Sequence, residues 1–192
     1  MTVDLAEIAR YMRMGRTTPE GELAARVGRL RDEALKTIRP ARVWRRFPIA
    51  SDAIVSGDVR LDIVGTLARH LGGCRSAYLV CATIGASFDA FHRHAAVRSG
   101  TDALIVQAIG AALIEKLMDE TEDAIRAELA AGETLVSRYS PGYGTFPLWA
   151  QRPLLALLDA PRHVGVSLTD TLLMVPSKSV SAVIGVTKGE TR

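Results

Sequence analysis

The apolar run from Ala77 to Ile84 is the feature that most constrains the fold of this chain. Gly72 and Gly73 precede the run and Gly85 ends it, so these residues mark its boundaries. A continuous apolar run of this length is typical of a strand that lies inside a sheet. We therefore expect residues 77–84 to form a central strand.

Apolar residues at helical spacing predict that the N-terminal part of the chain, about residues 1–40, is helical. A first helix is expected around Ile8. A second is expected to have Thr18 as its N-cap and Pro19 in its first turn. Pro40 should end this second helix. Shorter helices are expected over residues 64–71, 87–95 and 148–158.

The longest helix is expected from about Thr101 to Ala130, and its small central residues Gly110-Ala111-Ala112 predict close packing against another helix. Strands are expected over residues 43–49, 59–63, 164–168, 172–175 and 180–186. Helices and strands are partly segregated along the chain instead of alternating as βαβ units. This order predicts an α+β fold with an antiparallel or mixed sheet.

The composition is that of one globular domain. With 192 residues and 48% hydrophobic content, the chain can bury one sizeable core, and we expect residues 1–192 to form a single domain. Acidic residues Asp4 and Glu7 stand where a signal peptide would be basic and then apolar, and no apolar run is long enough to span a bilayer. We therefore expect a cytoplasmic protein without membrane contact, in which Cys81 is a buried free thiol.

Basic residues cluster around Trp44, where Arg39, Arg42, Arg45 and Arg46 stand close together in a chain of net charge +3. Binding to nucleic acid is one interpretation of such a cluster. The cluster is short, however, and no helix-turn-helix or RNA-binding signature accompanies it. A solvated edge or a docking patch for a protein is the preferred interpretation.

The segment from Arg138 to Gly144, with the sequence RYSPGYG, has the composition of a ligand-binding loop. Arg138 can bind a carboxylate through two parallel hydrogen bonds, and Gly142 and Gly144 allow close approach of the backbone. Tyrosine faces can contact a ring or a cation. An ordinary turn is the alternative, because such Pro-Gly and tyrosine-rich turns are common.

Signatures of acid–base or nucleotide chemistry are missing: the chain has no Walker loop, no G-x-S-x-G motif and no G-x-G-x-x-G motif. Its histidines are scattered and are expected to be surface or packing residues without a metal role. The charged run from Asp119 to Asp123 is expected to be a solvated helix face. Glu115 lies near the apolar stripe of the same helix, so it can project into a site or serve as a snorkelling or capping residue.

Several segments, in their order along the chain, are similar to motifs of one family. They are Ile8-Ala9-Arg10-Tyr11-Met12, Trp44-Arg45-Arg46-Phe47-Pro48-Ile49, Ala82-Thr83-Ile84-Gly85, Ala108 to Glu115, Arg138 to Gly144, Gly165 to Thr169, Met174-Val175-Pro176 and Lys178 to Ser181. Together they resemble the reactivation domain of cobalamin-dependent methionine synthase, in the form that some bacteria encode as a separate small protein. The resemblance covers most of the chain and implies a curved α+β domain with a twisted sheet and flanking helices.

The resemblance also implies a function. Such a domain binds S-adenosylmethionine and presents its methyl group to the cobalt of a cobalamin held by a partner, the cobalamin-binding domain or subunit of methionine synthase. A flavodoxin- or ferredoxin-type donor reduces the inactive cob(II)alamin, and methyl transfer traps the product as methylcobalamin. The chain is then a component of methionine synthase that acts in trans, and not a self-sufficient enzyme. Its work is to bind and orient the ligand.

By the same resemblance Arg138 is expected to hold the polar groups of S-adenosylmethionine, Ser140 and Gly142 to supply backbone contacts, and Tyr143 to flank the ligand. Glu115 is added as a candidate for this site. No catalytic residue and no metal ligand is expected in the chain.

Two departures from the family pattern bear on affinity. Gln107 stands where the family usually has Asp at the head of the long helix, and the acidic residue that fused enzymes place near Ala111 is absent. The sequence also ends soon after Val186, whereas fused enzymes continue and add an aromatic contact. The affinity for S-adenosylmethionine is therefore expected to be weaker than in fused enzymes, or to need the surface of the partner.

Other functions remain open on the sequence. The chain can be an activator of a different corrinoid-dependent methyltransferase, with a similar ligand and another partner. It can also be a ligand-free scaffold or interaction subunit of the same fold, in which the Arg138–Gly144 loop is a structural corner. A self-contained methyltransferase is the least favoured, because no nucleotide-binding turn or catalytic base is visible.

Overall fold

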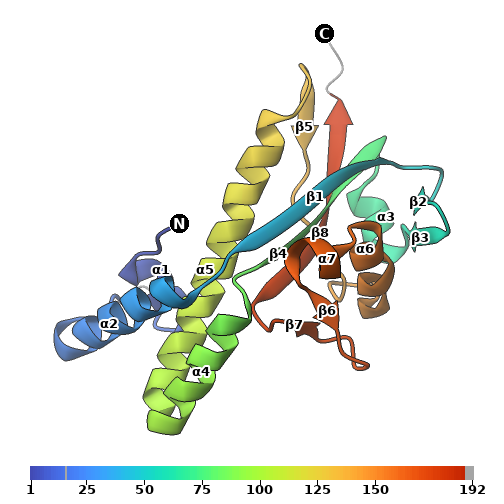
Figure 1. Ribbon diagram of the computed structural model, residues 1–192. Helices are drawn as coiled ribbons and strands as arrows, with labels where there is room; N and C mark the ends of the chain where they lie inside the picture. The colour runs from blue at the N-terminus through green and yellow to red at the C-terminus, as the bar shows by residue number, and fades with distance from the viewer. Residues whose placement is uncertain (16, 189–192) are drawn as a thin grey trace.

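A four-stranded antiparallel sheet forms the centre of the computed structural model, which describes residues 1–15 and 17–188 (Figure 1). Its strands lie in the order β1, β4, β8, β5, and each pair of neighbours is antiparallel. The strands span Ala41–Pro48 (β1), Ser76–Thr83 (β4), Ser179–Lys188 (β8) and Glu133–Leu135 (β5). The predicted α+β fold with an antiparallel sheet and flanking helices is confirmed.

The central position predicted for residues 77–84 is also confirmed, because β4 pairs with β1 on one side and with β8 on the other. Side chains of a strand alternate between the two faces of a sheet. On β4 they enter two separate cores: Tyr78, Val80 and Ala82 enter one, and Ala77, Leu79 and Cys81 enter the other. Burial on both faces explains why the run lacks the polar alternation of a half-exposed strand.

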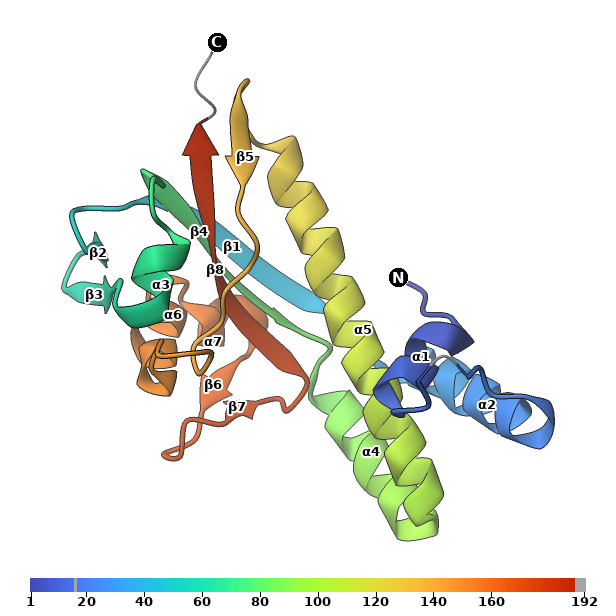
Figure 2. The ribbon, with the colours of Figure 1, turned by 180° about the vertical axis from the view of Figure 1, so that it is seen from behind.

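Four helices form the layer on one side of the sheet. They are α1 (Leu5–Tyr11), α2 (Gly21–Thr37), α4 (Ala86–Arg98) and α5 (Gly100–Ala127). Helix α5 lies against the sheet, and α1, α2 and α4 pack against α5 (Figure 2). Ser99 caps α5, since its side chain accepts a hydrogen bond from the backbone N–H of Asp102. A β-carbon added to Gly110 of α5 would lie 2.5 Å from the Phe88 ring of α4, so the predicted close packing at this glycine is confirmed.

Short elements cover the other face around the second core. They are β2 (Ala53–Ser56), β3 (Val59–Asp62), α3 (Gly65–His70), the 3₁₀ turn Leu148–Ala150, α6 (Gln151–Leu157), α7 (Ala160–Val164), β6 (Ser167–Leu168) and β7 (Met174–Val175). The strands form two separate hairpins, β2–β3 and β6–β7. The sheet therefore lies between helix α5 on one side and short helices with hairpins on the other (Figures 1 and 2).

Two sequence expectations about boundaries were wrong. Helix α2 begins at Gly21 and not at Thr18, because Gly21 has a φ of 54° that turns the chain after the buried Pro19. The strand expected over residues 164–168 is reduced to Ser167–Leu168, since Val164 ends α7 and Gly165 follows it in the left-handed conformation. Strands β2 and β5 and helix α7 were not predicted from the sequence.

The basic cluster lies on the edge strand β1 and is partly neutralised within the chain. Arg46 donates two hydrogen bonds to Glu133, at 2.9 and 2.6 Å, and Arg42 lies over the Trp44 ring at 5.6 Å. Glu133 therefore has a pKa lowered to about 2, chiefly by the hydrogen bonds from Arg46 and then by one from the Ala130 N–H.

Among the helices of the described residues, none combines the length and apolar character needed to cross a bilayer.

Candidate ligand-binding site

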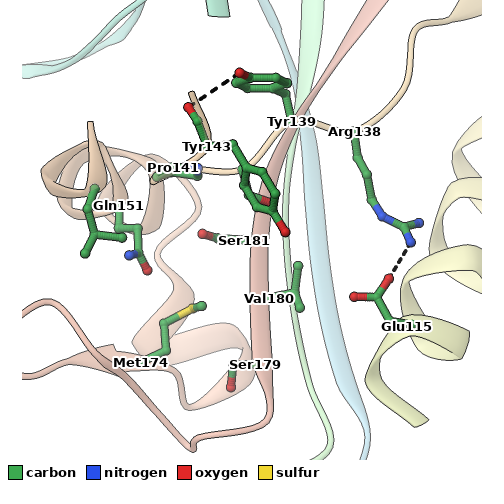
Figure 3. A pocket seen from close by; sticks show the side chains of 12 residues that line it. Glu115, Arg138, Tyr139, Pro141, Tyr143, Gln151, Met174, Ser179, Val180 and Ser181 are labelled. Atoms are coloured by element: carbon green, nitrogen blue, oxygen red, sulfur yellow. Dashed lines mark hydrogen bonds and ion pairs between the residues drawn. The ribbon is translucent and has the colours of Figure 1, made fainter. Parts of the chain in front are cut away.

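A cavity of about 550 Å³ opens where helix α5 and the loop after β5 diverge from the first residues of β8 (Figure 3). Twelve residues line it: Glu115, Arg138, Tyr139, Ser140, Pro141, Tyr143, Leu148, Gln151, Met174, Ser179, Val180 and Ser181. They come from both covering layers and from the sheet itself. A volume of this size accommodates a ligand as large as a nucleoside with an amino-acid substituent.

The tyrosine-rich loop is held against helix α3 by two threonines. Thr66 Oγ1 accepts hydrogen bonds from the hydroxyl of Tyr139 at 2.7 Å and from the N–H of Thr145 at 3.1 Å. In return, the Thr66 N–H donates to Thr145 Oγ1 at 2.9 Å. A β-carbon on Gly144 would lie 2.7 Å from Thr66 Oγ1, so this close approach requires glycine. The loop is therefore a fixed structure and not a loose turn.

Tyr139 also fixes the loop to the sheet and to a histidine. It exchanges two backbone hydrogen bonds of 2.9 Å with Val183 of β8, and its ring lies 4.8 Å from the ring of His70. His70 in turn hydrogen-bonds to the carbonyl of Ser137 at 2.6 Å. His70 thus has the packing role expected of the histidines, and Tyr139 forms a wall of the cavity.

The outer edge of β8 is open beside the loop. Alternate residues of an antiparallel strand direct their backbone N–H and C=O groups to the same neighbour. The N–H and C=O groups of Val183 both bond to Tyr139 of the loop. Those of Ser181, two residues earlier, point to the same side of β8, and at this position the cavity lies beside the strand. The backbone of Ser181 can therefore hydrogen-bond to a bound molecule.

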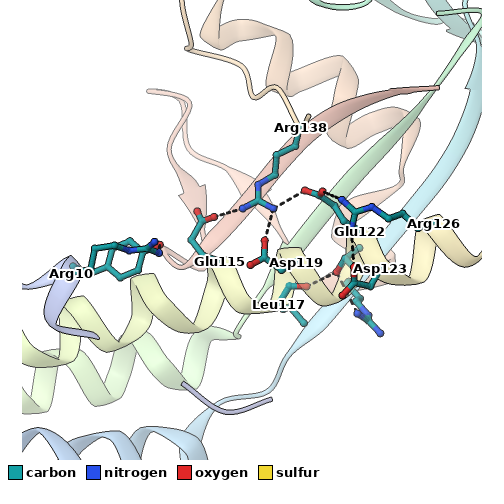
Figure 4. A network of polar contacts seen from close by, with 11 residues as sticks. Arg10, Glu115, Leu117, Asp119, Glu122, Asp123, Arg126 and Arg138 are labelled. Atoms are coloured by element: carbon teal, nitrogen blue, oxygen red, sulfur yellow. Dashed lines mark hydrogen bonds and ion pairs between the residues drawn. The ribbon is translucent and has the colours of Figure 1, made fainter. Parts of the chain in front are cut away.

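Arg138 is the charged centre of the site (Figure 4). Its Nη1 donates to Asp119 at 2.8 Å and to Glu122 at 2.6 Å, and its Nη2 donates to Glu115 at 2.6 Å. Burial on its own would lower the pKa of Arg138, but the hydrogen bonds to Asp119 and Glu122 and the charge of Glu115 raise it above the ordinary value. The guanidinium is therefore permanently charged and held by helix α5.

The charged run of α5 is the predicted solvated face only in part: the side chains of Asp119 and Asp123 are 58% and 74% exposed, but Glu122 is not. Glu122 is buried at 7% exposure, and it accepts hydrogen bonds from both Arg138 and Arg126. Helical spacing places Glu115, Asp119 and Glu122 on one side of α5, facing the loop. Arg138 stands 19 positions from Asp119 and 16 from Glu122 in the sequence, and the fold brings these residues together at the site.

The structure places four of the five predicted site residues on the cavity: Glu115, Arg138, Ser140 and Tyr143. The fifth, Gly142, is absent from the lining, and its N–H donates to the carbonyl of Phe146 at 2.9 Å. Gly142 shapes the loop through a φ of 92°, which favours glycine. Whether these five residues contact a ligand stays a prediction.

Sequence reasoning from side-chain chemistry missed the opposite wall. Gln151 of α6, Met174 of β7 and the segment 179–181 of β8 all line the cavity. Met174 and Ser179–Ser181 lie in segments that had been noted as family-like, M-x-P and K-S-V-S, so a signal existed. No sequence motif distinguished Gln151 from an ordinary polar residue in a helix.

Comparisons with known proteins agree with this fold. A family model for the vitamin B12 dependent methionine synthase activation domain matches residues 76–190, which include the loop and β8. No curated protein sequence matches the chain. A crystal structure of the MetH reactivation domain bound to AdoHcy shares the fold, with a TM-score of 0.57 at 17% sequence identity, over 100% of this chain and 78% of that chain. Because the family model spans more than half of the sequence, the chain belongs to the family of vitamin B12 dependent methionine synthase activation domains.

Proposed function

We propose that this chain binds S-adenosylmethionine in the cavity beneath the Arg138–Gly144 loop and presents its methyl group to a cobalamin held by a methionine synthase partner in trans. The observation that carries the proposal is the composition of the cavity walls. One wall holds a guanidinium among carboxylates, and the wall across from it is neutral (Figure 3). A relative of the same fold was crystallised with AdoHcy, the thioether that remains after the methyl group leaves.

The charge of the cluster suits this ligand. Arg138 with Glu115, Asp119 and Glu122 carries one positive and three negative formal charges, a sum of −2. S-adenosylmethionine brings a sulfonium, an ammonium and a carboxylate, a sum of +1. A cationic ligand is therefore attracted to this wall, and the attraction is strongest for charges that the cavity shields from water.

Arg138 can receive the ligand's carboxylate by exchanging one partner. Glu115 is the partner that lines the cavity, and 35% of its side chain is exposed, against 10% for Glu122. The ligand's carboxylate takes the place of Glu115 on Nη2, while the ligand's ammonium pairs with the released Glu115. Glu122 stays on Nη1, so α5 keeps the guanidinium in position throughout.

The proposed reaction does not need an acid or a base from this chain. The methyl group leaves the sulfonium with its bonding electron pair remaining on sulfur, so the leaving group is neutral S-adenosylhomocysteine and no proton moves. Reduced cobalamin on the partner supplies the nucleophile when it is bound, and an external flavodoxin- or ferredoxin-type donor supplies the electron. The residues of the cavity hold and orient the ligand, which is the contribution that an oriented methyl transfer requires.

An apolar surface near the cavity fits a docking role. Five large apolar side chains there are exposed: Tyr143, Leu148, Trp149, Leu173 and Val175. They belong to the loop, the 3₁₀ turn and the β6–β7 hairpin, all of which contribute to the cavity wall or adjoin it. Exposed apolar groups that gather at one place typically mark a contact surface. We propose that this surface meets the cobalamin-binding part of the partner.

Reconstitution tests the proposal. A methionine synthase whose own activation domain has been removed is converted to its cob(II)alamin state, then supplied with S-adenosylmethionine and a reducing system. We expect this chain to restore methylcobalamin formation, followed by its absorption spectrum, and Trp149→Ser to weaken the restoration. If the chain binds the ligand but does not restore methylcobalamin formation at saturating concentration, the role in trans is excluded. The proposed binding site is then unaffected.

A further inference from the structure

Gln151 has an unusual environment for a polar residue. It is the first residue of α6, it is 4% exposed, and it lines the cavity. Its Nε2 donates to the carbonyl of Leu172 at 3.4 Å. Its Oε1 is buried and has no hydrogen-bond partner among the described residues. A buried acceptor left unpaired costs about 1–3 kcal/mol, so such a group calls for a specific explanation.

The direction of the amide follows from its neighbour. A carbonyl oxygen accepts hydrogen bonds and cannot donate, so the Leu172 carbonyl must face the NH₂ group of Gln151. The opposite orientation would set two acceptors against each other. Oε1 is therefore the atom that faces away from Leu172, and Figure 3 shows the amide directed into the space above Met174.

We infer that Gln151 recognises the adenine ring, with Oε1 accepting a hydrogen bond from the exocyclic amino group. This inference rests on the proposed function, because it takes S-adenosylmethionine as the ligand. It adds a residue that determines which nucleoside the cavity accepts.

The position of Gln151 favours adenine over the amino-acid end of the ligand. The charged groups of the ligand find their partners at Arg138 and Glu115, on the far side of the cavity from Gln151 (Figure 3). Gln151 offers a neutral acceptor, which suits a neutral N–H donor. Leu148 and Met174 line the same wall and supply apolar surface for a planar ring.

Access to Oε1 requires a small movement, because the atom is shielded from solvent. Met174 lines the same cavity and has an unbranched side chain with several rotatable bonds. A methionine in such a place can change rotamer at little cost. A change of the Met174 rotamer is therefore one way in which adenine can gain access to Gln151.

The test compares two ligands that differ at one position. S-adenosylhomocysteine carries the amino group, and S-inosylhomocysteine carries a carbonyl oxygen in its place, which would face the acceptor Oε1. Calorimetric titration of the wild-type chain is expected to show binding of the inosyl compound that is about 10- to 100-fold weaker. Gln151→Leu is expected to bind S-adenosylhomocysteine about 10-fold more weakly and to lose most of the discrimination between the two compounds.

Glu33→Leu is the control, because Glu33 is an exposed polar residue on α2 that does not line this cavity. This variant should discriminate between the two compounds as the wild type does. Equal affinity of the wild-type chain for both compounds would overturn the inference and leave the proposed function intact. No binding of either compound by the wild type would overturn the proposed function, and the inference with it. The comparison of ligands on the wild-type chain needs no variant to fold.

Discussion

Arg138 donates a hydrogen bond of 2.6 Å to Glu122, which joins the ligand loop to the buried side of helix α5. The loop is connected to α5 by β5 in sequence, yet its position over the cavity depends on this contact across the fold. Glu122 is more buried than the other carboxylates around Arg138. It is therefore the partner whose loss should cost most.

A double-mutant cycle measures this link. Arg138→Met and Glu122→Gln should each lower the free energy of unfolding by about 1.5–3 kcal/mol, because each leaves a charged partner without its hydrogen bond. The double variant should lose about 1–2 kcal/mol less than the sum, as expected for residues in contact. Urea denaturation gives the four values. The exposed pair Arg60 and Asp52 is the control, with an expected coupling energy below about 1 kcal/mol. Strictly additive effects of the Arg138 and Glu122 substitutions would contradict a stabilising contact between these two residues.

Thr66 should govern the order of the loop. Thr66→Val removes the oxygen that accepts hydrogen bonds from Tyr139 and Thr145. We therefore expect the free energy of unfolding to fall by about 1–3 kcal/mol and hydrogen exchange at the Thr145 amide to become faster. Thr66→Ser keeps the hydroxyl and should retain the slow exchange. Unchanged exchange in the valine variant would mean that these bonds do not hold the loop.

Two glycines in helices should respond to alanine in opposite directions. Gly110→Ala places a β-carbon 2.5 Å from Phe88 and 2.8 Å from Lys178, so overpacking should destabilise the chain by about 1–3 kcal/mol. Gly28 of α2 has no atom within 4 Å of the same position, so Gly28→Ala should stabilise by about 0.5–1 kcal/mol. Thermal unfolding of both variants measures these opposite effects on stability. If the Gly110→Ala variant were as stable as the wild type, α4 and α5 would be able to move apart without loss of stability.

The pair of Glu133 and Arg46 should make stability depend on acid pH. The folded pKa of Glu133 is lowered from the ordinary 4.5 to about 2, so the pair contributes stability above pH 4.5 that is lost as the pH falls toward 2. Glu133→Gln should therefore be less stable than the wild type at neutral pH, and the difference should shrink between pH 4.5 and 2. Glu33→Gln, at an exposed position of α2, should follow the wild type throughout. A difference that does not depend on pH would contradict this role of the pair.

The elements that could be predicted from the sequence are those whose burial imposes a long pattern. Residues 77–84 are buried on both faces, and α5 places an apolar stripe against the sheet, so each shows a continuous signal. Strand β5 has only three residues, which is too short for a period to appear, and strands β6 and β7 are shorter than the segments expected to contain them. Their pairing is decided by neighbours that lie far away in sequence.

The residues of the site also fall into two groups, those that a local sequence signal reveals and those that only the fold reveals. Arg138 and Tyr143 were found because the loop concentrates unusual residues, and the resemblance to a family pointed to the same segment. Glu122 was wrongly placed on a solvated face, since its position on α5 alone does not reveal that Arg138 of the loop covers it. Gln151 became visible only when its burial and its unpaired oxygen were known.

The position of the ligand is tested most directly by titrating isotopically labelled protein with S-adenosylhomocysteine while following the backbone amide resonances. Saturable shifts are expected at the amides of Arg138 to Ser140, Gly142, Tyr143 and Ser181, which line or adjoin the cavity. Amides around Leu104, in the separate hollow between α1 and α5, should not move. The absence of saturable shifts, or shifts centred on Leu104, would contradict binding of the adenosyl ligand in the cavity beneath the Arg138–Gly144 loop.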